Sequence, residues 1–326
     1  MIEVIFEKTG LPEEVLQVKE SSAPEPKPHE VQIQVKARNI NPSDLMFIQG
    51  KYGIQPNLPS SAGFEAAGIV SKSDAEGKVP VGTRVMFTAQ GTTMGTWREY
   101  ITLPAKQVIP MPDGMPFEVA CQAFVNPVTA VALVNLSALK EGEWLLLTAG
   151  ASAFGKFAIQ VARSKGIKVA CTVRHDEQKQ YLMDLGADLV VNTEKEDLNK
   201  AIAASTEDGV SAVFDDVGGI LGAKALASLK QLGTMYVFGL LSLQNMPVNT
   251  GMMIFKEVKI EGFWLSSLLQ RISSEERAEL YEETQAFLMK DDSKAEVAEK
   301  FPLSEIKAAL AAYNRPGRNG KILLVS

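Results

Sequence analysis

Residues 144–165 read WLLLTAGASAFGKFAIQVARSK, and this stretch decides the fold. It opens with an apolar run, which predicts a strand over 144–148. Small residues follow, and from 155 to 165 apolar residues recur at helical spacing, which predicts a helix. A turn of small residues between a strand and a helix lets backbone N–H groups approach a pyrophosphate, and the helix dipole favours its negative charge.

The turn reads AGASAFG over 149–155, which is looser than the G-x-G-x-x-G spacing of many dinucleotide sites. Its place between a strand and a helix favours nucleotide binding over the alternative, an ordinary tight turn. The candidate pyrophosphate-binding residues are Gly150, Ser152, Ala153, Phe154 and Gly155.

Apolar runs of strand length continue beyond this helix and alternate with helical stretches. The predicted strands are residues 168–173, 189–191, 212–215, 234–238 and 258–261. Such alternation indicates an α/β fold with a doubly wound parallel sheet, whose buried strands are apolar throughout. We therefore assign a dinucleotide-binding domain to residues 122–264.

The first part of the chain has another pattern. Residues 31–37 alternate as VQIQVKA, which is typical of a half-buried strand. Short runs at 67–71, 84–88 and 99–103 follow, separated by Pro and Gly. This pattern predicts a compact, β-rich, barrel-like domain.

The tail is predicted to contain helices at 275–289 and 303–313 and a closing apolar strand, KILLV, at 321–325. We expect it to return to the β-rich domain. That domain then comprises residues 1–121 and 265–326, with the parallel sheet inserted into it.

The second strand of the parallel sheet ends at Arg174, followed by His175. A carboxylate at this place would bind the ribose hydroxyls of NAD, whereas a guanidinium offers a charged, bidentate partner for a 2′-phosphate. This predicts NADPH as the cofactor. The alternative is that Arg174 pairs on the surface with Asp176 or Glu177.

The chain has two histidines, His29 and His175, and two cysteines, Cys121 and Cys171, and none of them is clustered in sequence. A catalytic zinc needs about three such ligands in one cleft, so zinc chemistry is not expected. The two cysteines lie in apolar runs, which predicts buried free thiols in a reducing compartment.

The net charge is −6, without a long run of like charge, so we expect no nucleic-acid partner. No apolar run reaches the ~20 residues that span a bilayer, and we expect no membrane contact. The first residues, MIEVIFEKTG, show no targeting pattern. These features predict a cytoplasmic enzyme with a small-molecule substrate.

At this point the chain resembles the medium-chain dehydrogenase/reductase superfamily over essentially its full length. In the zinc alcohol dehydrogenases of that superfamily, two early segments supply metal ligands. The matching segments here are NPSD at 41–44 and GFE at 63–65, with Asn41 and Phe64 at the ligand positions. The resemblance implies a GroES-like β-rich domain, a Rossmann sheet and a zinc-independent branch.

Within that superfamily the chain is similar to the 2-enoyl thioester reductases. The segments that carry the similarity are INPSD at 40–44 with Tyr52, GTWR at 95–98, NPVTA at 126–130 and GFWL at 262–265. One departure is GFEAAG at 63–68, which is closer to the quinone reductases (zeta-crystallin-like). Tyr52 is also shared with that branch.

The resemblance implies NADPH-dependent reduction of an activated C=C bond, with hydride going to the β-carbon of a 2-enoyl thioester. Tyr52 would supply the proton, Asn41 would orient the nicotinamide or Tyr52, and Trp264 would shape the acyl pocket. Asn41 and Trp264 are also implied in cofactor binding, and the further residues implied in it are Thr129, Phe238, Gly239, Phe263 and Lys321. Each also has a plainer interpretation, as a surface loop residue, a turn residue or core filling.

Two other functions stay open from the sequence. One is an NADPH:quinone or alkenal/enone oxidoreductase, which needs the same fold and cofactor. The other is a nucleotide-binding protein without turnover. The resemblance also implies a homodimer formed through the last strands of the parallel sheet, and the apolar run 232–243 fits this, although burial within one subunit explains that run equally well.

Overall fold

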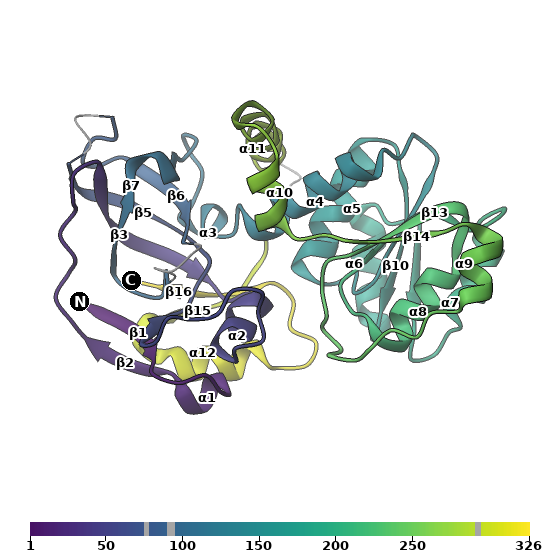
Figure 1. The fold of residues 1–326 in the computed structure, drawn as a ribbon, viewed down its shortest axis with the longest axis horizontal. Coiled ribbons are helices and arrows are strands. Elements are labelled where there is room, and N and C mark those ends of the chain that lie inside the picture. Colours follow the sequence, from purple (N-terminus) through teal and green to yellow (C-terminus); the bar gives the residue numbers. More distant parts are fainter. Residues whose placement is uncertain (75–77, 90–94, 291–294) are drawn as a thin grey trace. The chain divides into compact units, whose positions relative to one another are not determined.

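The computed structural model describes residues 1–74, 78–89, 95–290 and 295–326 (Figure 1). The chain divides into two compact units. The first unit comprises Met1–Val125 and Ala295–Ser326, and the second comprises Asn126–Lys294. The second unit is therefore an insertion into the first.

The second unit is built on a six-stranded sheet in which all strand pairs are parallel. Its strands, in spatial order, are β11 (Leu189–Asn192), β10 (Lys168–Val173), β9 (Trp144–Leu147), β12 (Val210–Asp215), β13 (Leu229–Val237) and β14 (Lys259–Gly262). The chain runs outward from β9 in one direction and then resumes on its other side. In such sheets, ligands bind outside the carboxyl ends of the strands at this switch point.

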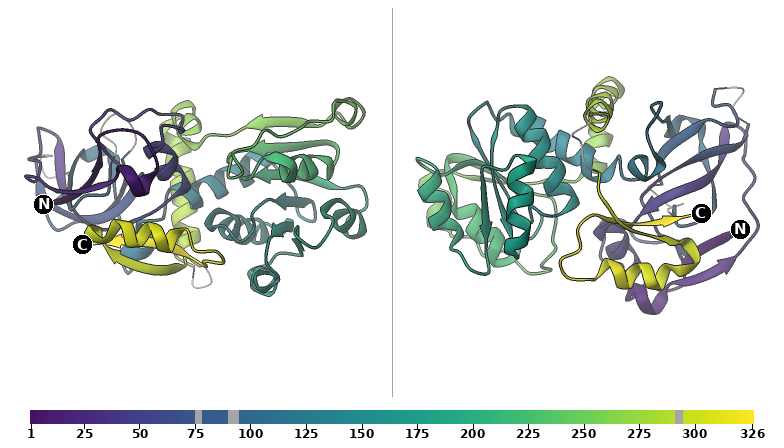
Figure 2. Two further views of the ribbon diagram at one scale, coloured as in Figure 1. Left: turned by 90° about the horizontal axis from the view of Figure 1, so that it is seen from below. Right: turned by 180° about the vertical axis from the view of Figure 1, so that it is seen from behind.

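Helices cover both faces of this sheet (Figure 2). The helices of this unit are α4 (Val125–Ser137), α5 (Ala153–Ser164), α6 (Lys179–Leu185), α7 (Leu198–Ser205), α8 (Gly219–Ala227), α9 (Thr250–Lys256), α10 (Leu265–Arg271) and α11 (Ser274–Leu288). Helix α5 packs on α6, and α7 packs on α8. One core of this unit centres on Leu146, Val213 and Met235, which are fully buried.

The first unit contains a seven-stranded sheet and a small three-stranded sheet. The larger sheet has the order β15 (Val297–Pro302), β16 (Lys321–Val325), β3 (Glu30–Asn39), β5 (Glu65–Ser73), β6 (Arg84–Thr88) and β8 (Val108–Pro110), with β7 (Tyr100–Pro104) also paired to β3. The smaller sheet has the order β2 (Gln17–Glu20), β1 (Ile2–Phe6) and β4 (Ser60–Ser61).

The helices of the first unit are short, and two of them position site residues or the C-terminal strand. They are α1 (Pro12–Val15), α2 (Pro42–Ile48), α3 (Phe117–Ala120) and α12 (Ile306–Tyr313). Helix α2 starts at a capping box, because the backbone N–H of Asn41 donates to Asp44 while the Asn41 side chain accepts from the N–H of residue 44. Helix α12 packs on β15 and β16.

The predicted fold class is confirmed: a parallel Rossmann-type sheet is combined with a β-rich unit. The closing strand returns as predicted, because β16 pairs antiparallel with β3. Both cysteines are free and buried. Along the described ranges, no helix is both long and apolar enough to cross a bilayer.

The division of the chain differs from the predicted boundary at residue 265. Helices α10 and α11 lie in the second unit, not with the β-rich domain. The ring of Phe287 lies 6.3 Å from that of Phe157 on α5, and Glu283 forms an ion pair with Lys165 at 2.9 Å. Helix α11 buries Leu280, Thr284, Phe287 and Leu288, and its sequence does not indicate which unit these residues contact.

Candidate active site

The turn between β9 and α5 is anchored to the neighbouring strand β10. The N–H of Ala149 donates to Oγ1 of Thr172 (3.1 Å), and the N–H of Gly150 donates to the carbonyl of Thr172 (2.8 Å). The turn is therefore held at the carboxyl end of the sheet, beside the switch point.

Two glycines of the turn leave no room for a side chain. A Cβ at Gly150 would lie 2.7 Å from Sγ of Cys171, and a Cβ at Gly155 would lie 2.5 Å from the carbonyl oxygen of Gly150. Close packing of strand, turn and helix is the reason that dinucleotide turns use glycine. The residues present thus fit a turn on which a pyrophosphate can rest.

The start of α5 leaves N–H groups for a ligand. Ser152 caps the helix, and its Oγ accepts from the N–H of Gly155 at 3.0 Å. The N–H groups of Ala153 and Phe154 are the first two of the helix and have no partner within it. Together with the positive end of the helix dipole, they form an anion-binding position.

Phe238 and Gly239 follow β13 and reach the same edge of the sheet. The rings of Phe154 and Phe238 are in contact, with centroids 4.2 Å apart. A Cβ at Gly239 would lie 1.9 Å from Oδ1 of Asp216, so this backbone also requires glycine. The structure therefore brings together the predicted turn and the predicted strand end.

Asp215, at the end of β12, organises this edge and was not among the predicted site residues. Its Oδ1 accepts from Oγ1 of Thr148 (2.8 Å) and from the N–H of Val217 (3.2 Å), and its Oδ2 accepts from the N–H of Gly218 (3.0 Å). Asp215 is fully buried. An acidic residue at the end of an apolar strand, followed by DVGG, was the available signal.

Arg174 follows β10 directly and is exposed. The predicted alternative was an ion pair with Asp176 or Glu177. Asp176 is instead bound by Lys195 (2.5 Å) and by Nδ2 of Asn192 (2.7 Å). Within the part of the chain that the structure describes, Arg174 forms no ion pair, so its guanidinium stays available for a phosphate.

Three other predicted residues lie elsewhere in the second unit. Phe263 follows β14, is buried, and donates its N–H to the carbonyl of Val237 (2.9 Å). Trp264 is 40% exposed and stands at the start of α10. Thr129 is buried within α4.

Tyr52 lies in the first unit, in the loop that follows α2. Its ring packs against that of Phe64 with centroids 5.0 Å apart, and Phe64 in turn contacts Phe47 at 6.0 Å. Phe64 is the residue at the superfamily's second metal-ligand position. The plainer interpretation, a tyrosine projecting from a surface loop, does not describe a ring that packs on this core cluster.

Asn41 and Lys321 belong to a buried polar cluster in the first unit, formed by Asn39, Asn41, Asp44, Glu65 and Lys321. Nδ2 of Asn41 donates to Oε1 of Glu65 (2.9 Å) and to Oδ1 of Asn39 (3.1 Å). Nζ of Lys321 donates to Oδ1 of Asn41. The structure thus brings two predicted residues, Asn41 and Lys321, into direct contact.

Burial shifts the ionisation of two members of this cluster. Burial lowers the pKa of Lys321 to about 8, although the negative charges of Glu65 and Asp44 oppose the shift. Burial raises the pKa of Asp44 to about 7, against the hydrogen bond from the N–H of Asn41. Asp44 and Glu65 carry this chemistry and were missed, because each looks from sequence like an ordinary loop or strand acid.

Over the residues described, no three His, Cys, Asp or Glu side chains come together in a group that could hold a metal ion. At the two positions where the zinc enzymes of the superfamily have ligands, the side chains are a buried amide, Asn41, and a buried ring, Phe64.

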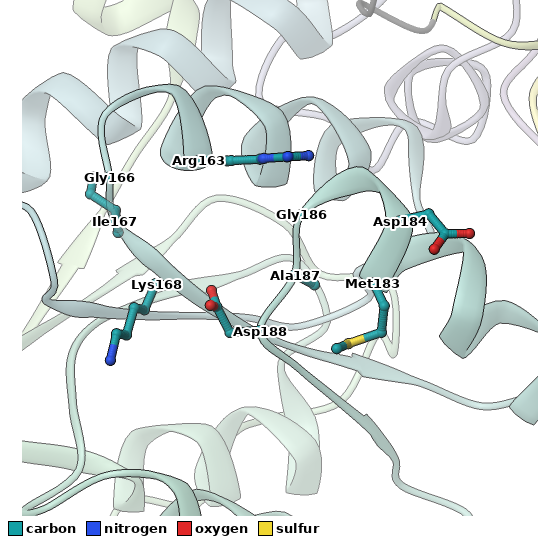
Figure 3. A pocket seen from close by; sticks show the side chains of 9 residues that line it. All are labelled: Arg163, Gly166, Ile167, Lys168, Met183, Asp184, Gly186, Ala187 and Asp188. Carbon is teal, nitrogen blue, oxygen red and sulfur yellow. The ribbon is translucent and has the colours of Figure 1, made fainter.

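A hollow of about 360 Å³ lies at the amino-terminal edge of β10, opposite the turn (Figure 3). Its charged lining residues are Arg163, Lys168, Asp184 and Asp188. Two positive and two negative groups favour neither anions nor cations. The carboxylate of Asp188 already accepts from the N–H of Val169 (2.8 Å), and we assign this hollow no role.

Two family models match the chain: a zinc-binding dehydrogenase model over residues 153–285, and an alcohol dehydrogenase GroES-like domain model over residues 27–113. The first begins at Ala153, in the last part of the dinucleotide turn, and the second covers the segment that carries Tyr52.

Among curated proteins, the mitochondrial enoyl-acyl-carrier-protein reductase of Caenorhabditis elegans is 31% identical over 94% of this chain and 90% of its own length. The corresponding enzyme of Rattus norvegicus is 30% identical over 96% and 85%. Among solved structures, the Escherichia coli quinone oxidoreductase complexed with NADPH has a TM-score of 0.90 and 29% identity, with full coverage of both chains. The chain therefore belongs to the medium-chain dehydrogenase/reductase superfamily, together with these enoyl reductases and quinone oxidoreductases.

Proposed function

We propose that this chain is an NADPH-dependent oxidoreductase that reduces the activated C=C bond of a 2-enoyl thioester. The observation that carries the proposal is Tyr52, held against Phe64 at a former metal-ligand position, in a chain that also has an intact dinucleotide turn. Full-length relatives named enoyl reductases support the same reaction.

The residues of the second unit fit the cofactor. The N–H groups of Ala153 and Phe154 would hold the pyrophosphate, and Arg174 would bind the 2′-phosphate. Phe238 and Gly239 would lie toward the nicotinamide, as would Phe263 and Thr129. When bound, NADPH supplies the hydride.

In the first unit, Tyr52 would donate a proton, or a hydrogen bond, to the substrate as negative charge develops on the thioester oxygen and the α-carbon. A positioned acid of this kind contributes roughly 100- to 10,000-fold in rate. Asn41 and Lys321 would act on the cofactor, and Trp264 would shape the acyl pocket and exclude water.

The second candidate is an NADPH:quinone or enone oxidoreductase. The observation that favours it is Phe64 with the sequence GFEAAG, together with the close likeness to the quinone oxidoreductase of Escherichia coli. An aromatic side chain at this position suits a flat, apolar acceptor.

The test follows NADPH consumption with crotonyl-CoA, with longer 2-enoyl-CoA esters and with a 1,4-quinone, for the wild type and for Tyr52→Phe. Turnover of the enoyl ester that falls by at least ~100-fold in Tyr52→Phe supports the proposal. Turnover of the quinone alone, unchanged in Tyr52→Phe, would establish the second candidate. Tight NADPH binding without any turnover would point to a non-catalytic nucleotide-binding protein.

A homodimer is proposed through the outer edge of β14. Over the described residues this strand pairs only with β13, and Lys259 and Glu261 are both exposed. An antiparallel pair of two copies centred on Ile260 would place each Lys259 opposite a Glu261, which stabilises such a pair. Sedimentation of the wild type should show a dimer, and Lys259→Glu should shift it toward monomer.

We also propose that the protein works in the cytoplasm, which the two buried free thiols support. The curated relatives are named as mitochondrial proteins. Fractionation of source cells, followed by detection of the chain, distinguishes the two compartments.

A further inference from the structure

Glu65 and Lys321 are opposite charges at the two ends of one carboxamide. Oε1 of Glu65 accepts from Nδ2 of Asn41 at 2.9 Å, and Oδ1 of Asn41 accepts from Nζ of Lys321. All three side chains are at least 96% buried. The amide of Asn41 therefore bridges a buried acid and a buried base that the sequence separates by more than 250 residues.

The carboxylate of Glu65 accepts four hydrogen bonds. Its Oε1 also accepts from Nδ2 of Asn39 (2.7 Å), and its Oε2 accepts from the N–H groups of Phe124 and Val125, both at 3.0 Å. A carboxylate with four donors cannot rotate without losing hydrogen bonds in a buried environment, where each loss costs roughly 1–3 kcal/mol.

This fixed acid decides which way the amide of Asn41 points. An ionised carboxylate only accepts hydrogen bonds, so the Nδ2 side of Asn41 must face Glu65. The Oδ1 side must then face Lys321, which only donates. The hydrogen bonds of Glu65 therefore fix the orientation of the Asn41 amide, and the amide in turn fixes the position of the Lys321 ammonium.

We propose that Glu65 is a positioning residue that, through Asn41, fixes the Lys321 ammonium and keeps it charged for cofactor binding. The inference rests on the proposed function, because it concerns a residue assigned there to NADPH. Glu65 itself would touch neither the cofactor nor the substrate.

The charges around Lys321 show why an acid is needed. Burial lowers its pKa to about 8, so a modest further shift changes its charge near neutral pH. Glu65 and Asp44 raise the pKa, as does Cys121 to a smaller extent, whereas Arg318 lowers it. Glu65 is the larger of the two carboxyl contributions. Without it, the pKa would fall further, and a neutral amine would replace the cation.

The experiment compares wild type with Glu65→Gln, which keeps the shape and removes the charge. NMR of ¹³C-labelled lysine reports the pKa of Lys321 in cofactor-free protein, and fluorescence titration reports NADPH affinity from pH 6 to pH 9. We expect the pKa of Lys321 to fall by on the order of one unit or more in Glu65→Gln. NADPH affinity at about pH 8 should then fall by roughly fivefold or more, and by less at pH 6.

Three further variants separate the effect of charge from the effect of position. Glu118→Gln removes a partly exposed acid of the same unit that pairs with Lys300, and it should change neither quantity. Glu65→Gln combined with Lys321→Arg should bind NADPH with little pH dependence over this range, because a guanidinium stays protonated. Glu65→Asp keeps the charge but is one methylene short of Asn41, so affinity should fall by a similar factor at every pH.

Unchanged Lys321 titration in Glu65→Gln overturns the inference and leaves the proposed function intact. If Glu65→Gln does not fold, Glu65→Asp decides, and unchanged NADPH affinity in that variant overturns the positioning role. A wild type that binds no NADPH at any pH overturns the proposed function instead, whatever the titration of Lys321 shows.

Discussion

The turn at residues 149–155 and the buried polar cluster around Glu65 are built in opposite ways. The turn uses backbone N–H groups and glycines that are close together in sequence, and its long-range support includes Thr172 on the next strand and the ring of Phe238. The cluster uses side chains from three distant segments, around residues 39–44, 65 and 321, and backbone N–H groups from a fourth, residues 124–125. The turn is therefore sensitive to shape, whereas the cluster is sensitive to charge.

The largest expected difference is in pH dependence. Burial raises the pKa of Asp44 from 3.8 to about 7, so between roughly pH 4 and pH 7 the folded protein binds more protons than the unfolded chain. Stability from this group is complete below about pH 4 and is lost as pH rises toward 7, by about 4 kcal/mol at most.

Asp44→Asn should therefore flatten the decline of melting temperature between pH 5 and pH 7.5. Calorimetry over this range measures the change, and Asp113→Asn, at an exposed acid of the same unit, is the matched control. An unaltered slope in Asp44→Asn would show that the cluster is not the source of charge sensitivity.

A single added methyl group in the turn should instead lower both stability and NADPH binding. In Gly155→Ala the new Cβ would lie 2.5 Å from the backbone oxygen of Gly150, so the helix and the turn must separate. We expect about 1–3 kcal/mol of lost stability and a loss of NADPH binding of at least ~10-fold at every pH. Gly262→Ala, where a Cβ meets no atom within 4 Å, should keep both quantities, as denaturant titration and fluorescence would show.

The same contrast explains what the sequence could predict. The turn, its flanking strand and helix, and the closing strand 321–325 were predictable because each pattern is local. Asp44 and Glu65 were not, because their chemistry arises from neighbours that only the folded chain supplies. The assignment of α11 to the second unit was not predicted for the same reason, because Phe287 and Glu283 contact residues of α4 and α5 that are distant in sequence.

A further prediction concerns which cofactor the turn accepts. Arg174→Ala should lower NADPH affinity by roughly 10- to 100-fold, because a charged hydrogen bond to a phosphate contributes about 1.5–3 kcal/mol. NADH affinity should stay the same, since NADH has no 2′-phosphate. Lys195→Ala is the matched control, because that cation already pairs with Asp176. Equal losses for both cofactors would place Arg174 away from the ribose.

The smallest expected effect concerns the packing of Tyr52 against Phe64. At this place in the first unit, the site depends on the shape of side chains rather than on their charge. Phe64→Leu removes the ring that lies 5.0 Å from Tyr52 and retains most of the buried volume. Substitutions of this kind lower the free energy of unfolding by about 1 kcal/mol, and an aromatic pair contributes a similar amount.

The control is Phe87→Leu, in a separate core cluster of the same unit, which should lower the free energy of unfolding by as much. Of the two variants, Phe64→Leu should also lower kcat, by several-fold, with NADPH affinity unchanged, because that ring packs against Tyr52, the proposed proton donor. If both variants reduce kcat equally, Tyr52 is held by the unit as a whole and not by Phe64.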